Sequence, residues 1–293
     1  MTEISRARAI ALLAAAGVMP GCAGSNAIQV GSKNFTESIV IAELYAQVLE
    51  AAGYRVVRRL DLGSTQIALA AMRRGDIDLY PEYTGTALID VLGMPPMRDS
   101  RAIFETVRRE FAKRYAMTWL EPSPMNDSQG LATTRAIAQR YNLHTLSDLA
   151  PVASRLRLAA IPEFLTRADG LPGLQKLYGG FRFASVHTYD IALKYQALLT
   201  GQADVATAFT TDGAIAVNDL VVLRDDKHLW PAYNVAPVVR NALLQRKPRV
   251  AEVLNALSPK ITNTVAQRMN AAVERDDQDP ADVASAFLKG ALR

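Results

Sequence analysis

Few residues in this 293-residue sequence have the types and spacing that catalysis or metal binding requires. The three histidines, His144, His187 and His228, lie far apart, and no histidine or cysteine pair has metal-ligand spacing. The sequence has no G-x-S-x-G elbow, no G-x-G-x-x-G fingerprint and no phosphate-loop motif, which are the commonest hydrolase, dinucleotide and nucleotide signatures. We therefore expect a binding protein without metal or cofactor rather than an enzyme.

A polar segment near the start of the chain is a candidate for ligand contact. Gly31–Glu37 follows a short strand at Ile28–Val30 and precedes an amphipathic helix that Gly53 ends. Asn34 or Thr36 can cap the start of this helix. Strands near 55–60 and 77–79 and a helix near 65–74 follow, which predicts an α/β fold with a mixed, mostly parallel sheet. Ligands of such sheets bind at the carboxyl ends of the strands.

An internal repeat at an offset of 126 residues relates two strand–helix units. Ile67–Asp78 aligns with Leu193–Asp204, including the glycine after each helix. The same register places Tyr83 on Phe209, each after a short strand and before a helix. The two units would therefore each present one aromatic ring. For the helical part alone, chance recurrence of alanine-rich helices is a serious competing explanation.

Composition and charge restrict the class of protein further. The chain is 49% hydrophobic and 21% charged, which is ordinary for a globular protein long enough for two lobes. The net charge is +4, or +3 without residues 1–21, and no basic block with interleaved aromatics occurs. We therefore expect no nucleic-acid partner.

The N-terminus has the layout of a secretory signal peptide, which we place at residues 1–22. Two arginines precede the apolar stretch Ala9–Val18, which is too short to cross a bilayer. Cys22 is the only cysteine, and its site resembles a bacterial lipobox in which Gly21 fits while Met19 and Pro20 fit poorly. Lipid anchoring through Cys22 and plain secretion both remain open.

Five segments resemble the osmoprotectant-binding family of ABC importers. They are GSKNFTES (Gly31–Ser38), DIDLYPEYTGT (Asp76–Thr86), EFLTRADGLPGL (Glu163–Leu174), AFTTDG (Ala208–Gly213) and YNVAPVVR (Tyr233–Arg240). The similarity extends from Ile28 almost to the C-terminus. Members of this family bind glycine betaine, choline, carnitine or related solutes.

The resemblance implies a two-lobed type II periplasmic-binding-protein fold with the ligand cleft between the lobes. We expect residues 28–128 and 233–293 to form lobe 1 and residues 129–232 to form lobe 2. The chain would cross between the lobes near Asn126–Thr134 and Tyr233–Arg240, and these crossings would be the hinge. The protein would be a monomeric, extracytoplasmic solute-binding component, in the periplasm or at the outer face of the cytoplasmic membrane. It would deliver a small osmolyte to separate permease transmembrane subunits.

The resemblance also implies a binding site. The candidate residues are Tyr83, Phe209 and Tyr233 for an aromatic cage, and Lys33, Thr86 and Arg167 for a ligand carboxylate. A quaternary ammonium has no hydrogen to donate, so it must be recognised by ring faces, at about 0.5 to 2 kcal/mol each. Gln129 stands where relatives tend to have an aromatic, which leaves a different polar solute open. It also stays open whether these side chains only pack between the lobes, and whether the scaffold carries an enzyme.

Overall fold

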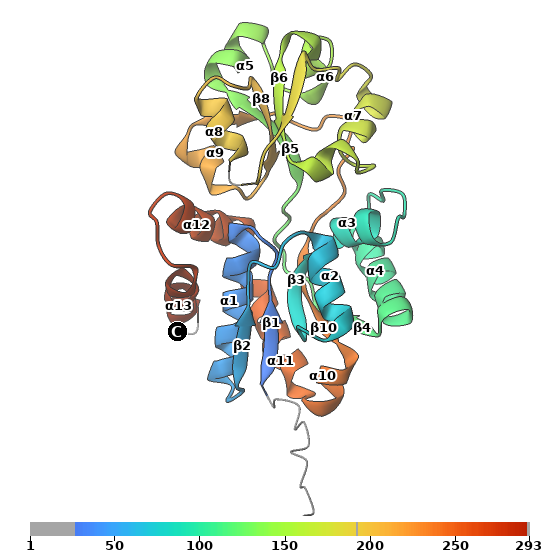
Figure 1. Cartoon of the computed structure of the whole chain (residues 1–293), viewed down its shortest axis with the longest axis vertical. Helices are drawn as coiled ribbons and strands as arrows, with labels where there is room; N and C mark the ends of the chain where they lie inside the picture. The colour runs from blue at the N-terminus through green and yellow to red at the C-terminus, as the bar shows by residue number, and fades with distance from the viewer. Residues whose placement is uncertain (1–26, 192, 292–293) are drawn as a thin grey trace, which may run out of the picture.

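A computed structural model describes residues 27–191 and 193–291 of the chain (Figure 1). It contains two five-stranded sheets, and each sheet forms the centre of its own lobe. The expected signal peptide and Cys22 lie outside the described residues, so export and lipid anchoring remain predictions. Within the described ranges, no helix has the length and apolar character that crossing a membrane needs.

The sheet of lobe 1 has the strand order β2-β1-β3-β10-β4. Its strands are β1 (Ile28–Gly31), β2 (Val56–Arg59), β3 (Leu79–Tyr83), β4 (Met117–Trp119) and β10 (Val235–Arg240). β1 pairs in parallel with β2 and β3, whereas β10 pairs antiparallel with β3 and β4. Four strands therefore run in one direction. The strand β10, which follows lobe 2 in the sequence, lies between β3 and β4 and runs in the opposite direction.

The sheet of lobe 2 repeats this arrangement with the order β7-β6-β8-β5-β9. Its strands are β5 (Gln129–Thr134), β6 (Arg157–Ala160), β7 (Ser185–Thr188), β8 (Val205–Phe209) and β9 (Leu220–Val222). β6 pairs in parallel with β7 and β8, and β5 pairs antiparallel with β8 and β9. The predicted α/β class with two mixed sheets is confirmed.

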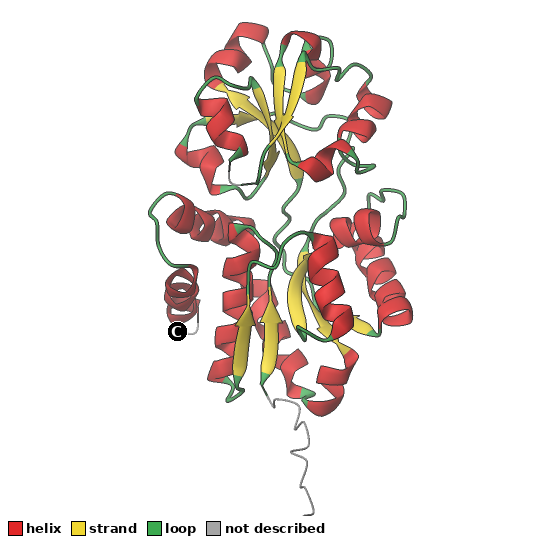
Figure 2. Ribbon diagram, in the orientation of Figure 1, coloured by secondary structure: helices red, strands yellow, loops and turns green. Residues whose placement is uncertain are grey.

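Helices cover both faces of each sheet (Figure 2). In lobe 1 they are α1 (Thr36–Ala51), α2 (Thr65–Arg74), α3 (Thr84–Thr86), the π-helical η1 (Ala87–Val91), α4 (Ser100–Tyr115), α10 (Asn241–Arg246), α11 (Arg249–Leu257), the short η4 (Ser258–Lys260), α12 (Asn263–Glu274) and α13 (Pro280–Ala291). In lobe 2 they are α5 (Arg135–Tyr141), α6 (Leu146–Leu149), the short η2 (Ala153–Arg155) and η3 (Pro162–Leu165), α7 (Leu171–Tyr178), α8 (Lys194–Leu199) and α9 (Gly213–Val217). Each lobe therefore has a helix–sheet–helix architecture.

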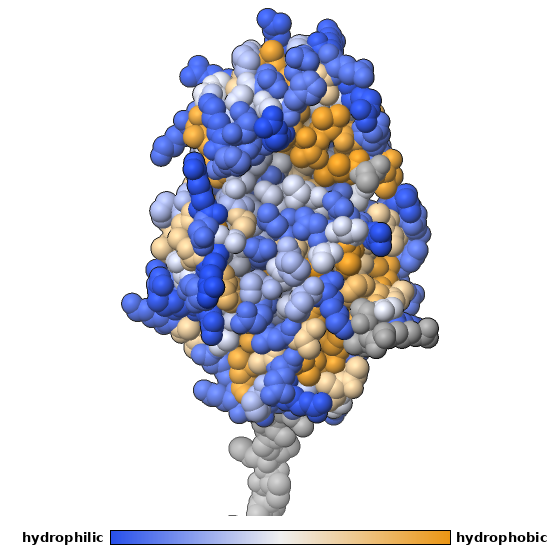
Figure 3. Space-filling model, turned by 180° about the vertical axis from the view of Figure 1, so that it is seen from behind, coloured by the Kyte–Doolittle hydropathy of each residue, from blue (hydrophilic) through white to orange (hydrophobic). Residues whose placement is uncertain are grey.

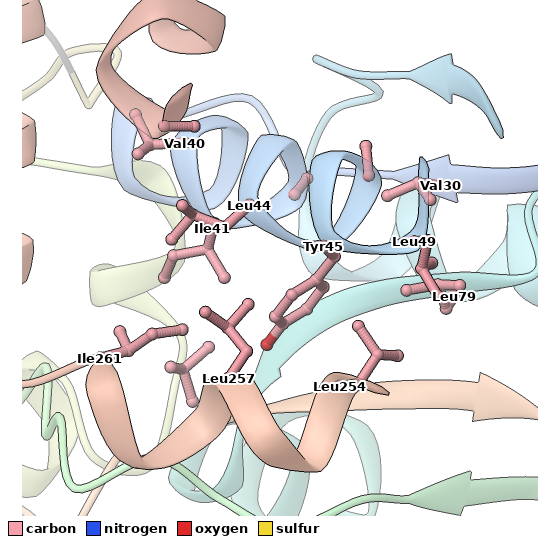
Figure 4. Close-up of a cluster of buried hydrophobic side chains, with 14 of the residues drawn as sticks. Val30, Val40, Ile41, Leu44, Tyr45, Leu49, Leu79, Leu254, Leu257 and Ile261 are labelled. Atoms are coloured by element: carbon pink, nitrogen blue, oxygen red, sulfur yellow. The ribbon is translucent and has the colours of Figure 1, made fainter. Parts of the chain in front are cut away.

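The C-terminal helices complete the core of lobe 1. Ile41, Leu44 and Tyr45 of α1 recur at helical spacing and point toward Leu254 and Leu257 of α11 (Figure 4). All five side chains are buried. Burying one such leucine stabilises the fold by about 1.5 to 3 kcal/mol. Lobe 1 therefore depends on residues from both ends of the chain.

The surface contrasts with this core. Seen from behind, it is largely hydrophilic, and its hydrophobic side chains gather in separate patches on the two lobes (Figure 3).

The internal repeat is confirmed. β3 and β8 start and end at the same offset of 126 residues, and each is the third strand of its sheet. The glycines before them, Gly75 and Gly201, both have positive φ, at 85° and 71°. The aspartate that precedes each strand accepts a backbone N–H from the neighbouring strand at 2.9 Å. Tyr83 and Phe209 therefore end equivalent strands in the two lobes.

The predicted caps of α1 are wrong. Its N-cap is Phe35, which makes no side-chain capping bond. The hydroxyl of Ser38 accepts the backbone N–H of Lys33 at 2.9 Å, and the backbone N–H of Asn34 donates to Gly63 at 3.1 Å. These bonds hold the segment before the helix, so Asn34 and Thr36 are left to line a cavity.

The predicted crossings between the lobes are displaced. Most of Asn126–Thr134 and of Tyr233–Arg240 belongs to β5 and β10, because these residues already pair in the two sheets. The chain passes between the sheets in residues 120–128 and 223–234. The two segments lie side by side, since the amide of Asp127 donates to the carbonyl of Tyr233 at 3.2 Å.

Candidate functional site: a cavity between the lobes

A cavity of about 1000 Å³ lies between the lobes, where β3 and β8 end. Its position agrees with the expectation that α/β sheets bind ligands at the carboxyl ends of their strands. The seven side chains that the sequence suggested all line it: Lys33, Tyr83, Thr86, Gln129, Arg167, Phe209 and Tyr233. The structure thus brings them together, and their part in binding a ligand stays a prediction.

Aromatic rings line the cavity from both lobes. Tyr83 and Tyr233 are almost fully buried, and Phe209 is partly buried. Phe35 and Tyr195 also line the cavity and were missed by sequence reasoning. Phe35 lies in the first family-like segment and its ring centroid is 6.1 Å from that of Tyr83, so the segment itself was the available signal.

Two lysine ammonium groups already contact these rings. The Nζ atom of Lys33 lies 4.6 Å from the ring centroid of Tyr83, and that of Lys194 lies 4.4 Å from the ring centroid of Phe209. Lys33 forms an ion pair with buried Glu82 at 2.7 Å, and Lys194 forms one with Asp212 at 2.9 Å. A lysine ammonium therefore already lies over one face of the Tyr83 ring and of the Phe209 ring, so a ligand cation could use only the other face of each.

Asp169 organises one wall of the cavity and was also missed. It is fully buried and accepts two hydrogen bonds from the guanidinium of Arg167, at 2.8 and 2.7 Å. It also accepts from the hydroxyl of Tyr233 and, at 2.6 Å, from Nε2 of Gln129. The second hydrogen of that Nε2 reaches the Tyr233 hydroxyl at 3.2 Å. Asp169 stands two residues after Arg167 in the third family-like segment, which was the signal for it.

These contacts change the expected role of the basic residues. Lys33 and Arg167 were expected to meet a ligand carboxylate, yet each already has a buried carboxylate partner. Desolvation disfavours the charged Arg167, but its hydrogen bonds to Asp169 outweigh this and raise its pKa. The geometry therefore does not favour a salt bridge between either residue and a ligand.

Carboxyl groups without a basic partner lie deep in the cavity wall. Burial raises the pKa of Glu37, although the hydroxyl of Tyr83 and the amide of Asn270 donate to it. Burial, followed by the charge of Glu37, also raises the pKa of Asp127. Across the described ranges, no cluster of three or more histidine, cysteine or acidic side chains could hold a metal ion.

One acidic residue stands closer to solvent. Desolvation of the Glu274 carboxyl, followed by the charge of Asp212, raises its pKa to about 7, although the residue as a whole is exposed. This carboxyl group, which lines the cavity, therefore changes charge near neutral pH.

The lobes touch on one side of the cavity, where α9 of lobe 2 packs against α12 of lobe 1 (Figure 1). A Cβ atom at Gly213 would lie only 2.8 Å from the backbone nitrogen of Ala271. Side chains of α12 add hydrogen bonds, from Asn270 to the carbonyl of Thr211 at 2.9 Å and from Gln267 to that of Thr210 at 3.1 Å. Glycine at position 213 therefore permits a close approach that no other residue allows.

Comparison with known proteins gives a consistent result. Residues 26–290 match the family model described as the substrate-binding domain of ABC-type glycine betaine transport systems. A glycine-betaine-binding protein of Pseudomonas aeruginosa is 34% identical over 94% of this chain and 92% of its own length. The ergothioneine transport permease and binding protein EgtU of Helicobacter pylori is 33% identical over 89% of this chain, which spans about half of that longer protein.

A solved structure supports the same relationship. A crystal structure of a glycine betaine/carnitine/choline ABC transporter aligns with this chain with a TM-score of 0.75 and 32% identity. The alignment covers 90% of this chain and 98% of that one. The similarity therefore includes both lobes.

Proposed function

Because the chain belongs to the family of substrate-binding domains of ABC-type glycine betaine transport systems, we propose that it binds a quaternary ammonium osmolyte in the cavity between its lobes. The family consists of substrate-binding components of importers, not of enzymes. We propose further that the loaded protein delivers the osmolyte to the transmembrane permease of an ABC importer. The family assignment supports this partner.

The observation that carries the ligand class is the ring of aromatic side chains in an acidic cavity. Tyr83, Phe209 and Tyr233 come from both lobes and from the segment between them. A quaternary ammonium gains cation–π and contact energy from such rings and needs no hydrogen-bond acceptor. The carboxyl groups of Glu37 and Asp127 line the same cavity, and a bound cation would favour their charged forms over the neutral forms that burial favours.

The position of Gln129 is compatible with this function. Both hydrogens of its Nε2 are donated within the protein, to Asp169 and to Tyr233. Gln129 therefore supports the position of the Tyr233 ring, and its amide nitrogen has no hydrogen left for a solute.

Calorimetric titration with glycine betaine, choline and carnitine tests the ligand class. Alanine at Tyr83, Phe209 or Tyr233 should each weaken binding by about tenfold or more, because losing a desolvated ring removes about 1 to 2 kcal/mol. Alanine at half-buried Tyr189, which does not line the cavity, serves as the control with unchanged affinity. Unchanged affinity in all three cavity variants would refute the site.

We also propose that the ligand draws the lobes together, since its candidate contacts lie in both. Small-angle scattering should show a smaller radius of gyration with a bound osmolyte than without it.

For the N-terminal segment, we propose export as a signal peptide and lipid attachment at Cys22. Mass spectrometry should find acyl chains on the mature protein and none on Cys22→Ala.

A further inference from the structure

We propose that the end of lobe 1 opposite the cavity is a basic face that binds an anionic phospholipid surface. The inference goes beyond solute binding and does not depend on it. It concerns which side of the protein lies against a membrane.

Four segments that are distant in the sequence form this end, which is the lower end of lobe 1 in Figure 1: residues 51–55, 72–78, 112–117 and 240–249. Three of them lead into β2, β3 and β4, and the fourth leads out of β10. The amide of Arg240 donates to the carbonyl of Asp78 at 2.9 Å. The amide of Asn241 donates to the carbonyl of Ala116 at 3.0 Å. The segments therefore belong to one continuous face.

This face, which we call the basic end, concentrates positive charge. Its four segments carry nine basic and two acidic side chains, a net charge of +7, whereas the rest of residues 27–293 carries −4. Seven of the nine basic residues are exposed, and Arg240 and Lys247 are half-buried. They are spread from position 55 to position 249, so the fold gathers them although the sequence contains no basic block.

The two acidic residues of the basic end neutralise it only in part. Asp76 pairs with Arg74 at 2.7 Å, where both side chains are exposed. Asp78 is buried and lies 3.6 and 3.8 Å from the guanidinium groups of Arg240 and Arg246. One carboxylate thus faces two arginines, and positive charge remains in excess.

The excess does not depend on where the segments are cut. Each adjoining helix adds one acidic residue within about one turn: Glu50, Glu110 and Glu252. Counting all three and none of the arginines beside them still leaves a net charge of +4. Arg55, Lys113 and Arg249 are exposed and form no ion pair with the described residues. Their charges are therefore available to a partner.

The course of the chain identifies that partner as a membrane. The amide of Ile28, at the start of β1, donates to the carbonyl of Arg55 at 2.8 Å, so the described chain begins at the basic end. Ala27 is five residues after Cys22, which corresponds to at most about 18 Å. A lipid on Cys22 would keep the basic end near phospholipid head groups, while the cavity lies at the other ends of the strands. Anionic lipids attract basic residues held this close to a bilayer.

Co-sedimentation with vesicles tests the proposal without the lipid. The protein is the chain from residue 22 onward with Cys22→Ala, so that no acyl chain contributes. It should bind vesicles of equal parts phosphatidylglycerol and phosphatidylcholine at low salt, and it should be released at high salt, because salt screens exposed charges. Adding Arg55→Gln, Lys113→Gln and Arg249→Gln should weaken this binding roughly a hundredfold, at about fivefold for each charge removed.

Lobe 2 supplies a matched control. Arg155, Lys176 and Arg182 are also exposed and form no ion pair with the described residues. Replacing all three by glutamine removes the same charge far from the basic end, so vesicle binding should stay within about twofold. Both triple variants should keep their affinity for an osmolyte, because none of the six side chains lines the cavity between the lobes.

Three results would contradict the proposal. An equal loss of vesicle binding in the two triple variants would show that only net charge matters and would overturn the basic end. Equal binding to vesicles of phosphatidylcholine alone would overturn the attraction to anionic lipid. Absence of binding to the anionic vesicles at low salt would also overturn it, and would leave an acidic protein surface as the partner of this end. Osmolyte titration reports on the proposed function separately from all three.

Discussion

Replacing Asp169 by asparagine should destabilise the protein strongly. The substitution keeps the size of the side chain but removes the charge that Arg167 contacts with two hydrogen bonds. The side chains of Arg167 and Asp169 are 12% and 0% exposed, so little water can replace the lost partner. Leaving one charge of such a buried pair uncompensated costs about 3 to 5 kcal/mol.

The chain supplies a matched control for this prediction. Arg74 and Asp76 form another ion pair two residues apart, at 2.7 Å, but their side chains are 63% and 56% exposed. Asp76→Asn should cost no more than about 1 kcal/mol, because water and salt already screen the pair. The two substitutions are chemically identical, so their difference reports burial.

Equilibrium unfolding in urea measures both free energies of unfolding. The Asp169→Asn variant should lose about 2 kcal/mol or more beyond the loss in Asp76→Asn. Adding Arg167→Met to Asp169→Asn should recover part of the loss, since no unpaired buried charge then remains. If the two single variants lose the same free energy within about 0.5 kcal/mol, or the double variant is less stable than Asp169→Asn, the buried pair does not act as described.

Three further predictions concern the lobes, the charge of the cavity and the buried lysine. Gly213→Val should force α9 away from α12, enlarge the radius of gyration in scattering and weaken ligand binding, whereas Gly290→Ala, where an added Cβ meets nothing within 4 Å, should change neither. The affinity for a cationic osmolyte should rise a few-fold from pH 6 to pH 8, because Glu274, whose pKa is about 7, then becomes negative, and Glu274→Gln should flatten this profile. Lys194→Met should lower the unfolding free energy by about 3 kcal/mol or more, because it leaves Asp212 without its buried partner, and an unchanged urea midpoint would contradict that role.

The sequence was most informative where local pattern and repeat agreed. The helix expected near 65–74 is α2, Thr65–Arg74, because its apolar spacing and following glycine are local signals. The alignment of Tyr83 with Phe209 is confirmed as two equivalent strand ends. The N-cap of α1 was misplaced, because the hydrogen bonds that the backbone N–H groups of Lys33 and Asn34 donate to Ser38 and Gly63 decide the shape of the preceding loop.

Pairing between distant residues could not be read from the sequence. Lys33 and Glu82 are 49 positions apart, so nothing local shows that the ammonium already has a partner. Asn270 lies in a C-terminal helix outside the family-like segments, and only the fold brings it to Glu37. Lys194 did leave a signal, since the repeat aligns it with Ala68, and a charge at an apolar position indicates a buried partner.

The insertion of β10 between β3 and β4 has a consequence for the order of folding. Lobe 2 is built from one continuous stretch, β5 to β9, so its sheet can form as soon as Val222 is available. The sheet of lobe 1 cannot close until Val235–Arg240 arrives from beyond lobe 2, and its core also needs α11. Until then β3 has no partner on the side where β10 will pair, so lobe 1 exposes an unpaired strand edge that is prone to aggregation, while lobe 2 is already folded. Refolding experiments should accordingly show lobe 2 acquiring protection from hydrogen exchange before lobe 1.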